Sequence, residues 1–338
     1  MSFSSEPIVI WGAGAIGGVL GAYWARAGVD VLLVDIDGEH VAACREGLAI
    51  EGPVEEFSLP VRAVTPDEIT GKYQETVLAV KAQATEAAMA ALLPHLADDG
   101  FVLSAQNGLN ERVIAAIAGP ARCMGAFVNF GADWLAPGRI LFGNRGAVVV
   151  GEIDGVIVER TRAMHDLLRL FEPDAVLTDD IWAYLWGKLG YGAMLFATAL
   201  TQNSMADNFA DPARRPLLAS LAHEVMAVAA AEGVAPKGFN GFEPAAFAPE
   251  GDPAAVAASL SALADFNRQT AKTHSGIWRD LAVRKRRTEV DPQIGAIVEI
   301  AKGHGIQTPY LARLVALIHD IEDGRRDQSP TTFRALAS

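Results

Sequence analysis

The sequence predicts an α/β protein in which a doubly wound parallel sheet is followed by an all-helical domain. Two observations support this. In the first half of the 338 residues, short apolar runs alternate with helical patterns, and from about Asp180 the chain becomes rich in alanine and reads as helix. Alternating strands and helices are typical of parallel sheets. We therefore expect domains at 1–177 and 178–324, and a polar, mobile tail at 325–338.

The composition is that of a folded protein, with 51% hydrophobic and 20% charged residues. The net charge of −13 argues against a general affinity for nucleic acid or anionic membranes. The two cysteines, Cys44 and Cys123, and the histidines show no metal-type spacing. We therefore expect a reduced, cytoplasmic protein without a metal. No basic region precedes the first apolar run, and no apolar run is long enough for a membrane span, so neither a signal peptide nor a span is expected.

The first apolar run, residues 7–11, leads directly into a G-x-G-x-x-G pattern that opens a helix at 19–27. In this context Gly12 permits a tight turn, Gly14 lets a pyrophosphate approach the backbone, and Gly17 lets the helix pack on the strand. The free N–H groups of the helix start would face the phosphates. The pattern thus predicts a Rossmann domain and a dinucleotide site built from Gly12, Ala13, Gly14, Ala15, Ile16 and Gly17.

The remaining elements follow in order. The second strand (30–34) is followed by a helix at 39–47 and a hairpin region at 48–64. Three more strands are then expected, at 76–80, 101–104 and 122–127. Helices at 85–96 and 111–118 separate them. Residues 129–151 look like turns between short strands, which we expect to finish the sheet in antiparallel fashion, before a helix at 157–171 and a strand at 175–177. The helical half predicts helices at 181–200, 216–232, 254–275, 291–303 and 309–324.

Polar residues stand where these strands end. Asp35 lies 21 residues after Gly14, close to where an acid would bind ribose hydroxyls, while Lys81 and Asn107 follow later strands. Ligands of doubly wound sheets bind at the carboxyl ends of the strands, so we group these residues with Gly12 in one site. Each of the last two has a structural alternative. Asn107 also suits a turn, and Lys81 could be the charged end of its strand.

Two charged residues stand out in the helical half. Lys188 lies in an otherwise apolar helical stretch, so its side chain must find a partner, reach the surface or face a polar cleft. Glu289 follows a basic run at 284–287. In isolation that run suits a solvated helix face, and Glu289 a surface ion pair or a cap.

Together these motifs resemble the ketopantoate reductase (2-dehydropantoate 2-reductase) family over roughly residues 7 to 320. The matching segments are Gly12–Gly17, Val80-Lys81-Ala82-Gln83, Gln106-Asn107-Gly108, Lys188-Leu189, Arg287-Thr288-Glu289-Val290-Asp291 and Gly305-Ile306-Gln307-Thr308-Pro309. The resemblance implies an enzyme that transfers a hydride from a nicotinamide cofactor to a small 2-keto acid, in a cleft between its two domains. It also suggests a homodimer.

The resemblance further implies roles for single residues. Lys188 matches the family's catalytic lysine, which hydrogen-bonds the carbonyl and supplies the proton as general acid. Glu289 matches the carboxylate that binds the substrate and orients the site. Asn107 matches the asparagine between cofactor and substrate, and Lys81 the lysine near the cofactor.

The sequence departs from the family around the substrate. The asparagines one and two turns after the catalytic lysine are replaced by Tyr191 or Gly192 and by Leu195 or Phe196, and the Ser-Ser-Met segment reads Ser275-Gly276-Ile277. There is also an apparent extra residue before Glu289. We expect a more apolar pocket lined by Tyr191, Phe196, Ser275 and Trp278, although these residues could equally belong to the core.

The second departure concerns the cofactor. The family generally uses NADPH, held by a basic residue after the second strand, whereas this chain has Asp35-Ile36-Asp37 there. Because a carboxylate repels a 2′-phosphate, NAD(H) is favoured over NADP(H). An NAD-dependent D-2-hydroxyacid dehydrogenase of the D-mandelate type, on the same scaffold, is the alternative activity. A non-catalytic NAD(H)-binding redox sensor is the alternative of another class.

Overall fold

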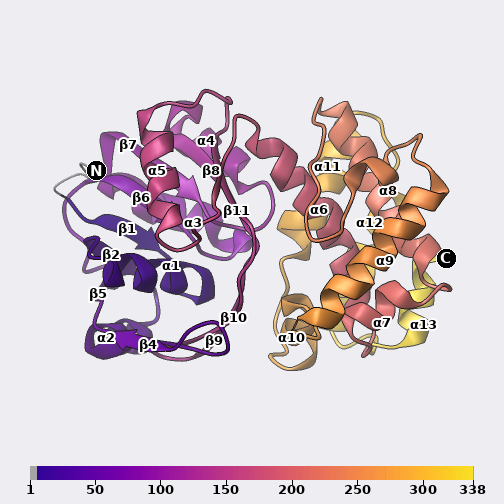
Figure 1. The fold of residues 1–338 in the computed structure, drawn as a ribbon, viewed down its shortest axis with the longest axis horizontal. Helices are drawn as coiled ribbons and strands as arrows, with labels where there is room; N and C mark the ends of the chain where they lie inside the picture. Colours follow the sequence, from indigo (N-terminus) through magenta and orange to yellow (C-terminus); the bar gives the residue numbers. More distant parts are fainter. Residues whose placement is uncertain (1–5, 271, 338) are drawn as a thin grey trace. The chain divides into compact units, whose positions relative to one another are not determined.

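The computed structural model describes residues 6–270 and 272–337. The chain divides into two compact units, Met1–Ile181 and Trp182–Ser338, which are coloured from indigo to magenta and from rose to yellow in Figure 1. The first unit is a mixed sheet with helices and the second is helical, as the sequence pattern predicts.

An eight-stranded sheet forms the centre of the first unit, in the order β12-β11-β8-β7-β6-β1-β2-β5. The strands β1, β2, β5, β6, β7 and β8 run parallel to one another, and β11 runs antiparallel to β8. This confirms the doubly wound fold class. The bounds are β1 (Ile8–Trp11), β2 (Val31–Val34), β5 (Arg62–Val64), β6 (Tyr73–Leu78), β7 (Leu96–Ser104), β8 (Cys123–Val128), β11 (Val148–Glu152) and β12 (Val176–Leu177).

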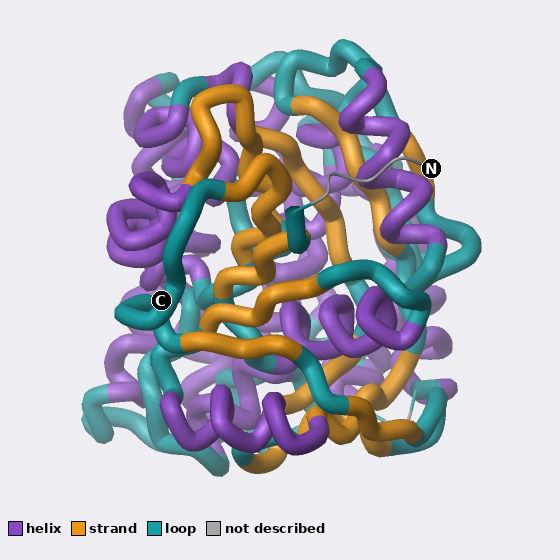
Figure 2. The backbone as a smooth tube through the Cα atoms, turned by 90° about the vertical axis from the view of Figure 1, so that its left-hand side faces the viewer, coloured by secondary structure: helices purple, strands orange, loops and turns teal. Residues whose placement is uncertain are grey.

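Helices cover both faces of this sheet because successive strand residues point to opposite sides. Ile8 and Ile10 belong to one core cluster with α1 (Ala15–Arg26) and α5 (Glu159–Arg169). Val9 and Trp11 belong to a second cluster with α3 (Thr85–Leu92) and α4 (Asn110–Ala118). Figure 2 shows the strands lying between helices. Burial on both faces explains why these strands read as continuous apolar runs.

A second, four-stranded sheet has the order β4-β3-β10-β9. It joins β3 (Leu48–Glu51) and β4 (Phe57–Leu59) to β9 (Gly131–Ala136) and β10 (Arg139–Asn144), and α2 (Gly38–Gly47) precedes β3. The expected hairpin is present, since β3 and β4 are antiparallel. The prediction that the strands of 129–151 finish the main sheet is wrong for β9 and β10, because Ile140 pairs with Ile50 of β3. A partner so distant in sequence leaves no local signal.

The second unit consists of helices. They are α6 (Ile181–Thr198), α7 (Met205–Ala210), α8 (Arg215–Ala231), α9 (Pro253–Gln269), α10 (Gly276–Ala282), α11 (Ala296–Gly303), α12 (Pro309–Glu322) and α13 (Pro330–Arg334), with a π-helical turn η5 (Asp291–Gly295) before α11. The expected single helix at 254–275 is wrong. α9 ends at Gln269, and Ser275 starts α10 by accepting the N–H of Trp278 on its hydroxyl.

The segment expected to be a mobile tail contains the short helix α13, which follows an irregular stretch. The hydroxyl of Ser329 accepts the Thr332 N–H and so caps α13, and the Ser329 N–H donates to Leu200 O at 2.8 Å. Phe333 and Leu336 are both buried. Phe333 lies in α13 and Leu336 in the turn after it, so two buried apolar side chains stand within a stretch whose overall composition is polar.

Candidate functional site

The three glycines of the first turn each meet a different steric requirement. Gly12 has φ +98°, and a Cβ there would lie 2.8 Å from Val80 N; a Cβ on Gly17 would lie 2.0 Å from Gly12 O. These two glycines therefore close the strand, turn and helix onto one another. A Cβ on Gly14 would meet nothing within 4 Å among the described residues. Gly14 thus borders open space at the start of α1.

That open space faces a helix N-terminus. α1 begins at Ala15 after its N-cap Gly14, with no side-chain cap within the described chain and no acidic residue in its first turn. The first amides of a helix lack partners inside the helix, and its dipole favours negative charge there. The turn and helix start therefore suit the pyrophosphate of a dinucleotide.

Asp35 is fixed at the end of β2 by the turn itself. Its Oδ2 accepts the Ala13 N–H at 2.8 Å, and its Oδ1 accepts the Asp37 N–H at 3.0 Å. Asp37 in turn caps α2 by accepting the N–H groups of Glu39 and His40. Each carboxylate oxygen has further lone pairs, which can accept ribose hydroxyls. Two carboxylates two residues apart disfavour an added phosphate there.

A relay of buried polar side chains connects Val80, the residue before Lys81, to Asn107, beyond the ends of β6 and β7. The Gln106 amide donates to Val80 O and to the Thr85 hydroxyl, both at 2.8 Å. The Thr85 hydroxyl donates to Asn110 Oδ1 at 3.0 Å, and Asn110 Nδ2 donates to Asn107 O at 2.7 Å. The relay therefore fixes the backbone next to Lys81 and at Asn107. The sequence reading missed Thr85, Gln106 and Asn110, for which the Gln-Asn-Gly turn was the available signal.

Lys188 is the one charged residue of α6 and is partly buried between two buried neighbours. The adjoining Gly187 has a packing reason, because a Cβ there would lie 2.1 Å from Lys237 O. The Lys237 N–H donates to Ala183 O at 2.9 Å, so the chain at this point lies directly against α6. Glycine therefore allows the loop to brace the helix beside the lysine.

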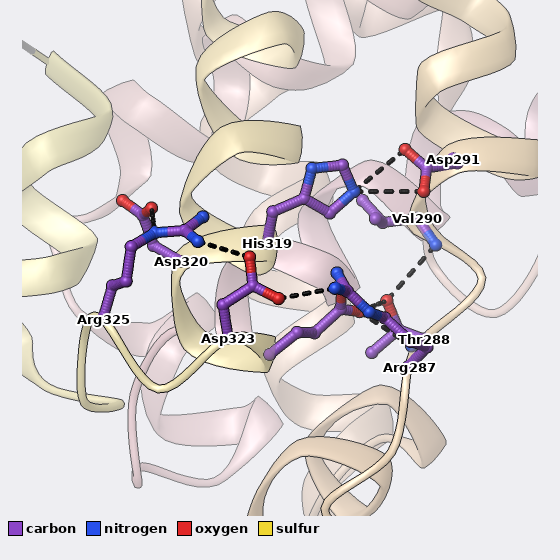
Figure 3. Close-up of polar contacts among 9 residues, drawn as sticks. Arg287, Thr288, Val290, Asp291, His319, Asp320, Asp323 and Arg325 are labelled. Atoms are coloured by element: carbon purple, nitrogen blue, oxygen red, sulfur yellow. Dashed lines mark hydrogen bonds and ion pairs between the residues drawn. The ribbon is translucent and has the colours of Figure 1, made fainter.

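The two residues on either side of Glu289, Thr288 and Val290, are both anchored, and Figure 3 shows them among their contacts. Glu322, at the end of α12, accepts the Thr288 N–H and hydroxyl, both at 2.7 Å, and Arg287 Nη1 at 2.8 Å. The Thr288 hydroxyl also accepts the Val290 N–H at 3.3 Å. Beyond it, His319 lies 3.0 Å from Asp291, at the first residue of η5. The backbone on both sides of Glu289 is thus fixed by α12, and π-helical turns are frequent at functional sites.

The basic run before Glu289 is tied to a buried acid instead of lying freely on a helix face. Arg284 Nη1 and Arg286 Nε lie 3.1 and 2.9 Å from Asp280 Oδ1, and only 4% of Asp280 is exposed. Lys285 between them adopts φ +49°, a left-handed conformation that is uncommon for residues other than glycine.

The four expected pocket residues lie in two different environments. Phe196 is fully buried, and Tyr191 stacks near Phe209 with its hydroxyl on Asn267. Burial raises the pKa of Tyr191 to about 12, so it is a neutral core phenol. Ser275 and Trp278 instead form the start of α10, with the indole N–H on Gln202 Oε1 at 3.1 Å. Of the two options given for these residues, pocket lining or core, the surroundings of Tyr191 and Phe196 are those of the core.

Among the described residues, no group of histidine, cysteine or acidic side chains is placed to hold a metal. In the same part of the chain, no helix has the length and apolarity to cross a membrane. Both cysteines are buried, and burial raises the pKa of Cys44 to about 12. A thiol that stays protonated is a poor nucleophile.

Replacing Glu322 by alanine is expected to lower the free energy of unfolding by roughly 2–4 kcal/mol, because the Thr288 N–H and hydroxyl lose a buried acceptor. Urea denaturation measures this. Glu299→Ala is the matched control, since Glu299 and its partner Lys302 are 70% and 65% exposed, and it should cost about 0.5 kcal/mol or less. Equal losses in both variants would contradict the anchoring role of Glu322.

Comparison with known proteins gives a consistent result. The family model described as ketopantoate reductase PanE/ApbA matches residues 8–155, and the model of its C-terminal part matches residues 180–322. The 2-dehydropantoate 2-reductase of Pyrococcus abyssi is 30% identical over 317 residues, covering 92% of this chain and 96% of that protein. The enzyme of Archaeoglobus fulgidus is 29% identical over 320 residues, covering 94% and 99%.

Two solved structures have a similar fold over nearly the whole chain. The PanE/ApbA family ketopantoate reductase from Ralstonia eutropha JMP134 superimposes with a TM-score of 0.77 at 26% identity, covering 95% of this chain and 99% of that one. A D-mandelate dehydrogenase, solved with NADH and anilino(oxo)acetate, has a TM-score of 0.80 at 24% identity, covering 94% and 99%. At that identity the second match shows a shared fold.

Proposed function

The chain belongs to the ketopantoate reductase family, and we propose that it reduces a 2-keto acid to the 2-hydroxy acid with a nicotinamide cofactor. One observation supports the cofactor half most directly. Gly12 and Gly17 admit no side chain, Gly14 borders open space before α1, and Asp35 holds the turn through Ala13. These residues fit the pyrophosphate and the adenosine ribose of a dinucleotide.

When bound, the cofactor supplies the hydride, and the remaining tasks fall to this chain's residues. Hydride addition to the keto carbon moves the C=O π electrons onto oxygen. In our proposal the Lys188 ammonium hydrogen-bonds that oxygen, stabilises the developing charge, and transfers one proton to it. The products are the hydroxy acid, the oxidised cofactor and a neutral Lys188 amine that takes up a proton from solvent.

The other proposed site residues bind and orient. Glu289 would bind the substrate, held in place by the Thr288 and Glu322 contacts on its N-terminal side. Asn107 would lie between cofactor and substrate and Lys81 near the cofactor, on the backbone that the Gln106 relay fixes. Ser275 and Trp278 are our candidates for the border of the substrate pocket.

We further propose a preference for NAD(H) and for an apolar keto acid. Asp35 and Asp37 support the preference for NAD(H). Both are carboxylates, and they stand after β2, where a basic residue would be needed to hold a 2′-phosphate. The residues that replace the family's asparagines support the substrate preference, since neither Tyr191 or Gly192 nor Leu195 or Phe196 carries an amide. The same observations favour an NAD-dependent D-2-hydroxyacid dehydrogenase of the D-mandelate type as the second candidate.

A substrate panel tests the proposal. Oxidation of NADH and of NADPH would be followed with ketopantoate, a branched aliphatic 2-keto acid and phenylglyoxylate. We expect kcat/KM to be at least about tenfold higher with NADH, as two carboxylates replace a phosphate-binding cation, and higher for the apolar keto acids than for ketopantoate. A preference for NADPH would overturn the role given to Asp35. Cofactor binding with no turnover on any keto acid would instead indicate a redox sensor.

A further inference from the structure

We propose that His40 is a positioning residue of the dinucleotide site, whose neutral imidazole holds the Ala13 carbonyl and ties the glycine turn to the four-stranded sheet. His40 lies in the first turn of α2 and is 1% exposed. The inference rests on the proposed function in one respect, namely that the cofactor binds at this turn.

The contacts of His40 define its tautomer. The Gly138 N–H points at Nδ1 with a distance of 3.0 Å, and the Trp134 indole N–H approaches the same nitrogen at 3.4 Å. Nδ1 must therefore be the acceptor, and the ring hydrogen belongs on Nε2. Nε2 lies 2.8 Å from Ala13 O, so it donates to that carbonyl. A doubly protonated ring would present a hydrogen to the Gly138 N–H, which these contacts do not allow.

His40 and Asp35 together bind both backbone polar groups of Ala13. The Ala13 N–H is bound by Asp35 Oδ2, and the Ala13 carbonyl is bound by His40 Nε2. Ala13 stands between the glycine that makes the turn and the glycine that borders the open space. The amides proposed to face the phosphates follow immediately, so their direction depends on how this peptide is held.

The Nδ1 side of the imidazole is bound by the four-stranded sheet, through Gly138. Gly138 makes the turn between β9 and β10 with φ +70°, and a Cβ there would lie 2.7 Å from the Ala43 Cβ of α2. The glycine thus lets this turn approach α2 closely enough to donate its N–H to His40. Through one buried ring, the turn of the second sheet supports the turn that begins α1.

Two isosteric substitutions separate the two hydrogen bonds. Glutamine can place an amide donor near the position of Nε2, so His40→Gln keeps the bond to Ala13 and loses the bond to Gly138. Asparagine can place an acceptor near Nδ1, so His40→Asn keeps the Gly138 bond and loses the Ala13 bond. Trp134→Phe is the control, because it removes only the longer contact to Nδ1.

The readouts are the dissociation constant for NADH, measured by fluorescence titration, and the unfolding midpoint. We expect His40→Asn to weaken NADH binding by about tenfold, the worth of one well-placed hydrogen bond, and His40→Gln and Trp134→Phe to weaken it less than about twofold. The midpoints of the two His40 variants should fall by similar amounts. Their kcat at saturating NADH should stay near that of the unaltered chain, because the ring touches no reacting atom.

Other outcomes overturn the proposal. If both His40 variants lose NADH affinity in proportion to their loss of stability, His40 serves only the core. If His40→Asn binds NADH normally, the hold on Ala13 is irrelevant to the cofactor. Should neither variant fold, ¹⁵N NMR of the unaltered chain still decides, since a ring hydrogen on Nδ1 or a cationic ring at neutral pH contradicts the inference. Failure of the unaltered chain to bind NADH would instead refute the proposed function.

Discussion

Replacing Lys188 by alanine is expected to lower kcat by about 10²- to 10⁴-fold, the usual contribution of a positioned general acid. The physical reason is that negative charge accumulates on the keto oxygen as hydride arrives, and alanine provides neither a cation nor a proton there. NADH affinity should not change, because the residues proposed to bind the cofactor lie in the first unit. Stopped-flow single-turnover measurements at saturating NADH and keto acid test this directly.

Two further variants sharpen the result. Lys188→Arg retains the charge but holds its proton too tightly to donate it, so activity should remain low. Lys302→Ala removes a lysine that is 65% exposed in the same unit and should leave kcat within about twofold. Near-normal turnover in Lys188→Ala with NADH bound would show that another group supplies the proton.

The second large effect concerns two glycines of the same motif. Gly14→Ala is expected to leave folding intact, because its Cβ would meet no atom of the described chain within 4 Å. It should nevertheless weaken NADH binding by about 100-fold, since the methyl group occupies the space proposed for the pyrophosphate and displaces it. Isothermal titration with NADH and a thermal melt of the same sample measure both quantities.

Gly17→Ala should behave differently. Its Cβ would lie 2.0 Å from Gly12 O, so the helix must move away from the strand. We expect a loss of roughly 1–3 kcal/mol or more in the free energy of unfolding, together with loss of NADH binding. Gly303→Ala, at the end of α11 where a Cβ meets no described atom within 4 Å, is the control for both variants. If Gly14→Ala bound NADH as tightly as the unaltered chain, the pyrophosphate would have to lie elsewhere.

The features that depend only on residue type and spacing along the chain could be predicted from the sequence. The strand before Gly12, the acid at Asp35 and the apolar helix around Lys188 could all be read from residue type and spacing. The partners of β9 and β10 could not, because Ile140 pairs with Ile50 across a long sequence interval. The short helix after residue 325 was not predicted for a related reason, because the burial of Phe333 and Leu336 depends on the elements they pack against.

The candidate site shows the same division. Its motif residues were predictable, but the residues that hold them were not. Gln106 looks like part of a turn, yet its amide reaches Val80 O across two strand ends. His40 looks like a helix residue without a metal partner, yet it bonds a peptide 27 positions away. Such bonds depend on which elements the fold brings together, and a single sequence carries no record of that.

The bond from Ala13 N–H to Asp35 also bears on the proposed NAD(H) preference, because it limits how this chain could be altered, in evolution or by engineering, to accept NADP(H). An exchange of Asp35 for arginine, the simplest route toward a phosphorylated ribose, would remove the acceptor that holds the glycine turn. Any gain in NADP(H) binding would then be opposed by damage to the turn that we propose binds the pyrophosphate. Asparagine at 35, which keeps an acceptor oxygen, combined with a basic residue at the exposed position of Ile36, is the route that avoids this conflict.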